Sequence, residues 1–408
     1  MLALARGATP YLVGGSVRDL LLGRATIDLD LVVVGDAIGV ARALHEALGG
    51  TDAALLRVHE TFGTATVIPG EGPPLDLITA RRESYPVPGA LPVVTPGTLD
   101  DDLRRRDFTI NAIALSLDPA TDGQLYDPLG GRADLNAGIV RALHADSFRD
   151  DPTRLLRATR YADRLGFKFD DATAAQFTVA LAAHVIDTIS IQRLSHEFVR
   201  LLAEERAAAM LDRLAGTGSL AGFAPALRWG VDERAAFVRL ERLRDSSLSP
   251  SSALFAAPLW EVRFAVLTAA LVPAAARAAA EALELPRRVS VLAEQAAALM
   301  GALVDGPLPR VDSTLGRLLD GYDLAAIEVV LACVAALEER QALLRYSLVV
   351  RETKPLLDGT ALRALGVPPG PIYREALAAL RDFKRDHPAA DTEDERAFLR
   401  AWLAAAGV

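Results

Sequence analysis

Two aspartates two positions apart, Asp28 and Asp30, open the apolar segment 28–34 (DLDLVVV). In a strand, residues two apart point to the same face. Two carboxylates side by side repel one another, unless a cation lies between them or water reaches them. Mg²⁺ prefers such hard oxygen ligands and shares its coordination shell with substrate phosphates. The pair therefore indicates a site for two metal ions, which would activate a hydroxyl and stabilise a leaving pyrophosphate. The alternative is a solvated strand start.

The segment 14–19 (GGSVRD) lies where a predicted strand ends and a predicted helix begins. Glycines let the backbone approach a phosphate closely, and a helix N-terminus offers N–H groups to it. Arg18, one turn into the helix, reaches the same anion. The segment is not a dinucleotide-binding fingerprint, because the third glycine is missing and no ribose-binding acid follows at the required distance. It predicts a phosphate-binding turn, with a tight turn that holds no ligand as the alternative.

Three consecutive arginines, Arg104, Arg105 and Arg106, precede the apolar segment that begins at Phe108. Guanidinium groups present a flat fork of donors that suits phosphates. We interpret the three as ligands of a triphosphate or of an RNA backbone, or else as a solvated loop end.

Asp151, Arg154 and Arg157 recur at helical spacing, so one helix face carries an acceptor followed by donors. Pro152 suits a first helical turn and Asp151 suits an N-cap. Asp151 and Arg154 together have the groups to hydrogen-bond the edge of a nucleobase, as a template strand would. The alternative is an i,i+3 salt bridge on an exposed helix.

The elements that position these residues change in type along the chain. Short segments rich in valine and leucine predict strands at 11–15, 28–35, 61–70 and 74–82, and helical periods predict helices at 16–23 and 36–50. Residues 84–98 contain four prolines and two glycines and predict a loop. From about residue 136 onward, strand signals almost vanish and helical stretches follow one another. These patterns predict an α/β head with a mixed sheet, followed by an all-α remainder.

The composition of the 408 residues limits the class of protein. The chain is 51% hydrophobic and 24% charged, which is typical of a globular protein of several domains. No apolar run approaches the roughly 20 residues that span a bilayer, and no secretory signal is recognisable, so we expect a cytoplasmic protein. The lone Cys333 excludes an internal disulfide. A net charge of −9 argues against a generic polyanion binder, but nearly all the positive charge is arginine.

In order and spacing, these segments resemble the class II tRNA nucleotidyltransferase and bacterial poly(A) polymerase family. The matching segments are GGSVRD (14–19), DLD (28–30), RRDFTINAIA (105–114), DPLGGRADL (127–135) and DDPTRLLRATRYADRLGF (150–167). The resemblance is strong over about residues 10–200 and returns faintly at 354–377. It implies a head of the DNA polymerase β-like nucleotidyltransferase fold and helical neck, body and tail domains. We assign the head to 1–135, the neck to 136–215, the body to 216–350 and the tRNA-binding tail to 351–408.

The resemblance also implies roles for individual residues. Asp28 and Asp30 would be catalytic and would bind two Mg²⁺ ions, with Asp76 as a candidate third carboxylate. The residues expected to bind the nucleotide are Gly14, Gly15, Ser16, Arg18, Arg106, Asp107, Asp151, Arg154, Arg157 and Arg160. The residues expected to bind RNA are Arg104, Arg105 and Arg164. The neck motif usually begins with Glu-Asp, but here it begins with Asp150, which puts the role of that position in doubt. Arg193 and Glu197 are expected to be structural.

The activity that the resemblance implies is template-independent addition of CMP and AMP, from CTP and ATP, to the 3′ end of tRNA, with no membrane or DNA partner. Within the family, the alternatives are an enzyme that adds only A, one that adds only CC, and a poly(A) polymerase. The loop before the RRD motif has ordinary length, which disfavours the CC-only alternative, and the chain lacks the basic extension of poly(A) polymerases. From a different class, the alternative is a non-catalytic RNA-binding relative, which the retention of both aspartates disfavours.

Overall fold

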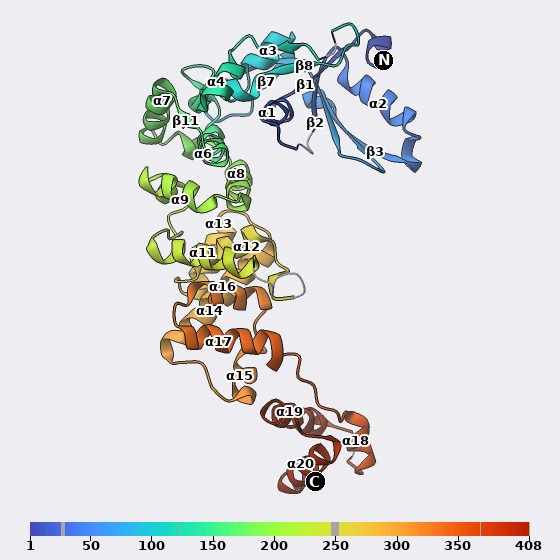
Figure 1. Cartoon of the computed structure of the whole chain (residues 1–408), viewed down its shortest axis with the longest axis vertical. Helices are drawn as coiled ribbons and strands as arrows, with labels where there is room; N and C mark the ends of the chain where they lie inside the picture. Colours follow the sequence, from blue (N-terminus) through green and yellow to red (C-terminus); the bar gives the residue numbers. More distant parts are fainter. Residues whose placement is uncertain (26–28, 122, 246–252, 368, 408) are drawn as a thin grey trace. The chain divides into compact units, whose positions relative to one another are not determined.

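The computed structural model describes residues 1–25, 29–121, 123–245, 253–367 and 369–407. The chain divides into two compact units, Met1–Phe223 and Ala224–Val408. The first contains a mixed sheet followed by helices, and the described residues of the second are helical apart from turns and loops (Figure 1). The expected α/β head and helical remainder are therefore confirmed. Within the described ranges, no helix has the length and apolar character that crossing a membrane requires.

Seven strands of the first unit form one sheet in the order β3-β4-β5-β2-β1-β8-β9. Their bounds are β1 (Thr9–Val13), β2 (Leu29–Val34), β3 (Ala54–His59), β4 (Thr64–Pro69), β5 (Leu75–Thr79), β8 (Ala114–Ser116) and β9 (Leu125–Tyr126). Strand β2 lies in the middle, antiparallel to β1 and parallel to β5. Strand formation in all four predicted segments is confirmed, and the sheet is mixed as expected.

Helices surround this sheet and then continue the first unit. Their bounds are α1 (Gly15–Leu21), α2 (Ala37–Ala47), α3 (Leu99–Arg104), α4 (Gly131–Ala137), α5 (Ser147–Asp150), α6 (Thr153–Leu165), α7 (Asp171–Ala182), α8 (Ile191–Ala203), α9 (Ala207–Gly216) and α10 (Ser219–Phe223). Short 3-10 turns are η1 (Leu4–Arg6), η2 (Gly50–Asp52), η3 (Glu60–Phe62), η4 (Thr109–Asn111) and η5 (Val185–Thr188). Beyond residue 136 the described strands are the two-residue pair β10 (Ile139–Val140) and β11 (Lys168–Phe169), so the predicted loss of strand character is confirmed.

The prediction of a loop over the whole of 84–98 was wrong at its ends. Strands β6 (Arg81–Ser84) and β7 (Val93–Pro96) form an antiparallel hairpin in which Ser84 pairs with Val93. The β-branched residues at 93–95 favour an extended pair, and Pro96 is tolerated because it ends the strand. Residues 85–92 connect the two strands.

Alternation along β2 sorts its side chains between the two faces of the sheet. Val33 belongs to a core cluster with Ala37 of α2, while Val32 belongs to a different cluster with Leu103 of α3. Since residues two apart share a face, Asp30 lies on the face of Val32, away from α2. The two-residue period of strand β2 thus places the Asp30 carboxylate on the face of the sheet where the site forms.

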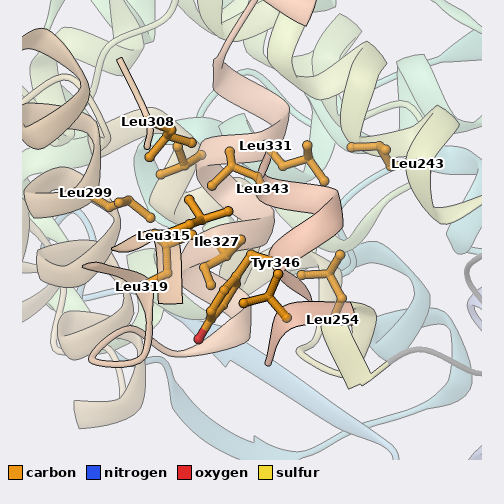
Figure 2. Packing of buried hydrophobic residues seen from close by; sticks show 12 residues of the cluster. Leu243, Leu254, Leu299, Leu308, Leu315, Leu319, Ile327, Leu331, Leu343 and Tyr346 are labelled. Carbon is orange, nitrogen blue, oxygen red and sulfur yellow. The ribbon is translucent and has the colours of Figure 1, made fainter. Parts of the chain in front are cut away.

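The second unit is built from helices packed on one another. Their bounds are α11 (Val231–Arg244), η7 (Ala253–Phe255), α12 (Leu259–Thr268), α13 (Pro273–Ala282), α14 (Arg287–Asp305), α15 (Asp312–Leu319), α16 (Leu324–Cys333), α17 (Leu337–Arg345), the π-helix η8 (Tyr346–Val350), α18 (Gly359–Ala364), α19 (Pro371–Asp386) and α20 (Thr392–Ala405). Leucines from α11, α14, α15, α16 and α17 form one core, and the ring of Tyr346 lies among them (Figure 2).

A buried arginine joins the last helices to this core. Arg385 of α19 donates to both carboxylate oxygens of Asp320, at 3.0 and 2.8 Å, and to the carbonyl of Val350. The hydroxyl of Tyr346 donates to Asp320 as well. Gly316 lies directly against the Arg385 guanidinium, so a side chain at that position would displace the arginine. The helices expected to bind tRNA are therefore fixed to α15 by paired charges rather than by apolar packing alone.

Replacing Leu331 by alanine is predicted to lower the free energy of unfolding by about 2–5 kcal/mol, because a fully buried leucine leaves a cavity in a packed core. Leu337→Ala is the matched control, since that leucine is 64% exposed and its loss is expected to change stability by less than about 0.5 kcal/mol. Chemical denaturation followed by circular dichroism measures both variants. Equal losses in the two variants would contradict the assignment of this core.

Candidate active site

A cavity of about 1230 Å³ lies within the first unit. Twelve arginines and eight carboxylates line it among the described residues. Because arginine keeps its proton at any ordinary pH, this lining gives the cavity a surplus of positive charge in a chain whose net charge is −9. The cavity is therefore suited to a multiply charged anion.

A pair of carboxylates faces this cavity from the middle of the sheet. Asp30 of β2 and Asp76 of β5 are register partners on adjacent parallel strands, and both line the cavity. The hydroxyl of Thr66 donates to Asp76 at 2.5 Å. Asp28, predicted as the partner of Asp30, lies outside the described residues. In the described part of the chain, no group of three or more metal-ligating side chains occurs, so the described carboxylates form a pair and not a complete protein cage.

The turn after β1 brings backbone to the same place. Gly14 has φ of +72°, and a Cβ there would lie 3.1 Å from Nη1 of Arg106 and 3.4 Å from Oδ2 of Asp30. A side chain at this position would be strained by the backbone angle and would crowd both groups. Gly15 and Ser16 line the cavity beside it, so the structure brings the start of the predicted turn next to Asp30.

One buried carboxylate holds two of the three consecutive arginines. Asp102 is fully buried, accepts from Arg105 through Oδ1 and from Arg106 through Oδ2, and its ion pairs have distances of 2.6 and 2.9 Å. Burial alone would raise the pKa of Asp102, but the two guanidinium groups outweigh it and lower that pKa. Arg105 also pairs with Glu83. Arg104 differs, because it is exposed, pairs with Asp100 and lines a separate pocket of about 260 Å³ instead of this cavity.

Arg18 is buried, and each nitrogen of its guanidinium donates to a protein group. It binds both oxygens of Asp19, at 2.9 and 2.8 Å, and the side-chain oxygen of Asn111 at 2.8 Å. The Asn111 amide in turn donates to Asp107, which accepts from Arg157 at 2.9 and 2.5 Å. The chain of contacts links α1, the RRD segment and α6 across the cavity wall.

Asp107 stays ionised although it is buried. Burial raises its pKa, but the Arg157 guanidinium and the hydrogen bond from Asn111 outweigh burial and hold the pKa at about 2. Asp107 was predicted to bind the nucleotide. The structure shows it lining the cavity and directing Arg157.

A tyrosine ring organises three of the arginines. The guanidinium carbons of Arg18 and Arg160 lie 5.1 Å from the centre of the Tyr161 ring, and that of Arg157 lies 5.9 Å from it. Cations over an aromatic face are attracted by its quadrupole. Phe108 packs edge-on against the same ring. The Tyr161 ring therefore attracts three guanidinium groups to one place in the cavity wall.

The neck-motif pair lies at the start of α6. Oδ1 of Asp151 accepts from the amide and hydroxyl of Thr153 and from Arg193 at 2.8 Å. Arg154 donates to the hydroxyl of Ser147 and to the carbonyl of Arg105, each at 2.8 Å. Both residues line the cavity, as their predicted role requires. Asp150 instead lines the smaller pocket, where burial raises its pKa and His144 lies 3.9 Å away.

Two further predicted arginines line the far part of the cavity. Arg160 pairs with Glu197 at 3.3 Å and Glu204 at 3.4 Å, and Arg164 pairs with Glu204 at 3.6 Å. The Nε atom of Arg160 is buried without a hydrogen-bond partner in the residues that the structure describes. The paired glutamates hold both guanidinium groups at the cavity wall.

Four residues that shape the cavity were not predicted as site residues: Asp102, Asn111, Tyr161 and Arg193. Tyr161 lies inside a recognised motif, four residues after Arg157 on α6, so helical spacing would have flagged it. Asn111 lies inside another motif, but Asp107 precedes the 3-10 turn that contains Asn111, so no helical period relates the two. Asp102 and Arg193 carry no comparable signal, because their partners are known only from the fold. Arg193, expected to be structural, lines the cavity.

Comparisons with known proteins find similar sequences over nearly the whole chain. Residues 10–141 match the family described as the poly A polymerase head domain, and residues 166–229 match the one described as the probable RNA and SrmB-binding site of polymerase A. The chain is 36% identical to the CC-adding tRNA nucleotidyltransferase of Deinococcus radiodurans, over 98% of this chain and 92% of that protein. It is 31% identical to the CCA-adding enzyme of Geobacillus kaustophilus, over 97% and 93%.

The chain spans less than half of the length of three A-adding relatives. The A-adding tRNA nucleotidyltransferase of Halalkalibacterium halodurans is 46% identical over 48% of this chain and 45% of its own length. The chain likewise spans 23% and 44% of the A-adding enzymes of Aquifex aeolicus and Geobacter sulfurreducens. Among solved structures, the Thermotoga maritima CCA-adding enzyme complexed with tRNA has a TM-score of 0.77 at 27% identity, over 98% of this chain and 93% of that one. A CCA-adding enzyme with ATP has a TM-score of 0.78 at 27% identity, over 100% and 92%.

Replacing Asp107 by asparagine is predicted to lower the free energy of unfolding at neutral pH by on the order of 2 kcal/mol, because a pKa near 2 in place of 3.8 stabilises the folded state. A lowered pKa contributes stability that is complete above about pH 4 and is lost as the pH falls toward 2. Denaturation curves at several pH values should therefore converge for wild type and variant at low pH. Asp118→Asn, in a surface turn, is the control, and a constant difference at all pH values would count against the ion pair.

Proposed function

Because this chain belongs to the family of tRNA nucleotidyltransferases and poly(A) polymerases, we propose that it adds CMP and AMP, from CTP and ATP, to the 3′ end of tRNA without a nucleic-acid template. The observation that carries the proposal is the in-register pair Asp30 and Asp76, facing a cavity lined by arginines. Nucleotidyl transfer releases pyrophosphate, and preorganised cations stabilise such developing charge.

The carboxylate pair fits magnesium. Mg²⁺ needs only one or two carboxylates from a protein, since water and substrate phosphate oxygens complete its shell. Asp30 and Asp76 offer such oxygens from the cavity wall, and Asp28 is the further ligand predicted from the sequence. When bound, Mg²⁺ would activate the attacking 3′ hydroxyl and stabilise the leaving pyrophosphate. We propose two ions at this position.

The groups around the glycine turn suit the triphosphate. Nη1 of Arg106 lies at Gly14, where backbone rather than side chain borders the cavity. Arg106 is held from behind by Asp102, so it needs no rearrangement to bind an anion. Arg18 lines the cavity beside the turn and contributes positive charge there, with its guanidinium oriented by Asp19 and Asn111.

Asp151 and Arg154 suit the bases of CTP and ATP. Cytosine and adenine both present an exocyclic amino donor beside a ring-nitrogen acceptor, whereas uracil and guanine present a carbonyl beside an N–H. A carboxylate acceptor next to a guanidinium donor matches the first pattern and opposes the second. Among the described residues, Oδ2 of Asp151 has no hydrogen bond, since Thr153 and Arg193 both use Oδ1. That oxygen is the proposed acceptor for the amino group.

Complete CCA addition is the activity we favour within the family. The segment before the RRD motif, residues 82–103, has ordinary length. Within it, the carbonyl of Gly89 accepts from Arg193 of α8. CC-only addition is the second candidate, because the Deinococcus radiodurans relative that aligns over 98% of this chain is a CC-adding enzyme. A-only addition is the third, favoured by the 46% identity to an A-adding enzyme over 48% of this chain.

The remaining assignments stay predictions. They are the division into head (1–135), neck (136–215), body (216–350) and tRNA-binding tail (351–408), and a cytoplasmic location. We propose that Arg105 and Arg164, which line the cavity, contact RNA. Arg104 would do so only at the rim, because it lies outside the cavity lining.

The test uses tRNA transcripts that end at the discriminator base, in C, or in CC, each incubated with Mg²⁺ and with CTP, ATP or both. We expect the first transcript to grow by CCA and stop, and Asp30→Asn to reduce that rate by at least about a hundredfold, since a metal ligand is lost. Asp36→Asn, at the exposed cap of α2, is the control. Growth that stops at CC would identify a CC-adding enzyme. Addition of a single A, and only to the CC-ending transcript, would identify an A-adding enzyme. No incorporation at all would indicate a non-catalytic RNA-binding protein.

Replacing Asp151 by asparagine is predicted to shift base choice. The asparagine carbonyl retains an acceptor for Arg193 and Thr153, while the amide puts a donor where Oδ2 was. Uracil and guanine then gain a partner, and cytosine and adenine lose one. The ratio of kcat/KM for CTP over UTP should fall by about five- to thirtyfold, the effect of about one to two kcal/mol in a hydrogen bond. Asp163→Asn, on the same helix but paired with Arg213 outside the cavity, should leave the ratio unchanged.

A further inference from the structure

A row of polar side chains crosses the sheet at the level of the proposed metal site. Asp30 of β2 pairs with Asp76 of β5. Asp76 in turn pairs with Thr66 of β4, and Thr66 pairs with Arg57 of β3. Register partners on neighbouring strands point to the same face, and the hydrogen bond from the Thr66 hydroxyl to Asp76 agrees with this. Arg57 therefore lies on the face of the two carboxylates, although it lies outside the cavity lining.

The two faces of β3 and β4 differ in what covers them. Leu56 and Val58 of β3 pack with Val67 of β4 in the core cluster beneath α2. On the opposite face, Arg57 is exposed and Leu55 is 59% exposed. The cavity lining on this side ends at β5. Beyond it, the face of the sheet continues over β4 and β3 with Arg57 accessible to a ligand.

Arg57 carries the only permanent positive charge on this face of β2, β5, β4 and β3, whose residues the structure describes in full. In the part of the chain that the structure describes, its guanidinium has no hydrogen bond or ion pair. Arg105 and Arg106 differ, because both are held by Asp102. A guanidinium without an acid partner is suited to a phosphate, which it can bind through two parallel hydrogen bonds.

The geometry of nucleotidyl transfer indicates the side from which the RNA approaches. The proposed triphosphate site lies at the glycine turn, which follows β1, and at Arg106. In an in-line displacement, the attacking oxygen and the leaving pyrophosphate lie on opposite sides of the reacting phosphorus. In the sheet order β3-β4-β5-β2-β1, the side opposite β1 is that of β5, β4 and β3. The attacking 3′ hydroxyl would therefore arrive across the face that carries Arg57.

We propose that Arg57 binds a phosphate close behind the 3′ hydroxyl of the RNA and so positions the end of that strand across β4 and β5. The inference rests on the proposed function, because the proposed triphosphate site fixes the direction of attack. Neighbouring strands lie about 4.8 Å apart, so the backbone of Arg57 stands roughly 10 Å from that of Asp76. An RNA strand whose terminal oxygen is at Asp76 thus brings its last phosphodiesters within reach of the Arg57 side chain.

The experiment compares Arg57→Gln and Arg57→Lys with Arg42→Gln. Arg42 is a matched control, because it lies on α2, on the opposite side of the sheet, and pairs with the exposed Glu60. Fluorescence anisotropy without nucleotide measures the Kd for a tRNA ending in CC at several salt concentrations. Two further tRNAs carry an uncharged methylphosphonate, one at the last phosphodiester and one at the preceding phosphodiester. The values of kcat and KM are measured on the transcript that the wild type extends.

We expect Arg57→Gln to raise the Kd and the KM for tRNA about five- to tenfold, the effect of one exposed charge-assisted contact. The value of kcat and the KM for the nucleotide should change little, because the triphosphate site and the carboxylates are untouched. The slope of log K against log salt should become less steep by about 0.7, the contribution of one phosphate contact to a single strand. Arg57→Lys keeps the charge and should keep the wild-type slope.

The methylphosphonates locate the contact. One of them should weaken binding to the wild type about as much as Arg57→Gln does, and it should add little to the loss in that variant, since both changes remove the same interaction. Additive effects for both methylphosphonates would overturn the inference, because Arg57 would then contact neither phosphate.

An unchanged Kd or an unchanged salt slope in Arg57→Gln would also overturn it. Equal changes in Arg42→Gln would do the same, because they would reflect net charge alone. A wild-type protein that binds the CC-ending tRNA but extends no transcript would overturn the proposed transfer function alone. The binding data would still decide whether Arg57 contacts the RNA.

Discussion

A carboxylate taken out of water loses hydration worth several kcal/mol, and it remains ionised only where cations and N–H donors replace that hydration. Four such carboxylates belong to the cavity wall or lie behind it, each with a side chain at most 10% exposed and each paired with arginine: Asp19, Asp102, Asp107 and Glu197. The ion pairs stabilise both partners. They keep the acids charged. They also hold several arginines close together, around the Tyr161 ring and behind the glycine turn, in spite of the repulsion between like charges. The geometry of the cavity depends on this layer of buried acids, while the sheet supplies the pair Asp30 and Asp76.

The local part of this arrangement was predictable from the sequence. Alternation along 28–34 predicts which face of β2 carries Asp30, and the apolar clusters on the two faces agree with it. The spacing of Asp151, Arg154 and Arg157 predicts a helix with one functional face, and α6 begins at Thr153. Glycines at 14 and 15 predict a turn with close backbone approach. In each case the signal lies within a few residues, where helix and strand periods act directly.

The long-range part was not predictable, because nothing in a local pattern says which charges meet. Asp102 looks like one of three acids in the first turn of a short helix, yet it alone is fully buried beneath two arginines. Arg193 stands 104 residues from its acceptor Gly89 and 42 from Asp151. The hairpin of β6 and β7 was hidden by four prolines, since the pairing partner rather than the segment itself decides that 93–96 is extended.

The residues that line the cavity are spread along the sequence, so they are synthesised at different times. The lining begins at Gly14 and ends at Arg206. A nascent chain emerges from the ribosome N-terminus first, so the sheet with Asp30 and Asp76 is exposed well before α6 and α8 bring the arginines that complete the wall. During that interval the site already has the glycine turn and Arg106, but it lacks Asp151 and Arg154, the residues proposed to contact the base. A growing chain therefore has charge for a triphosphate before it has the residues that would select its base.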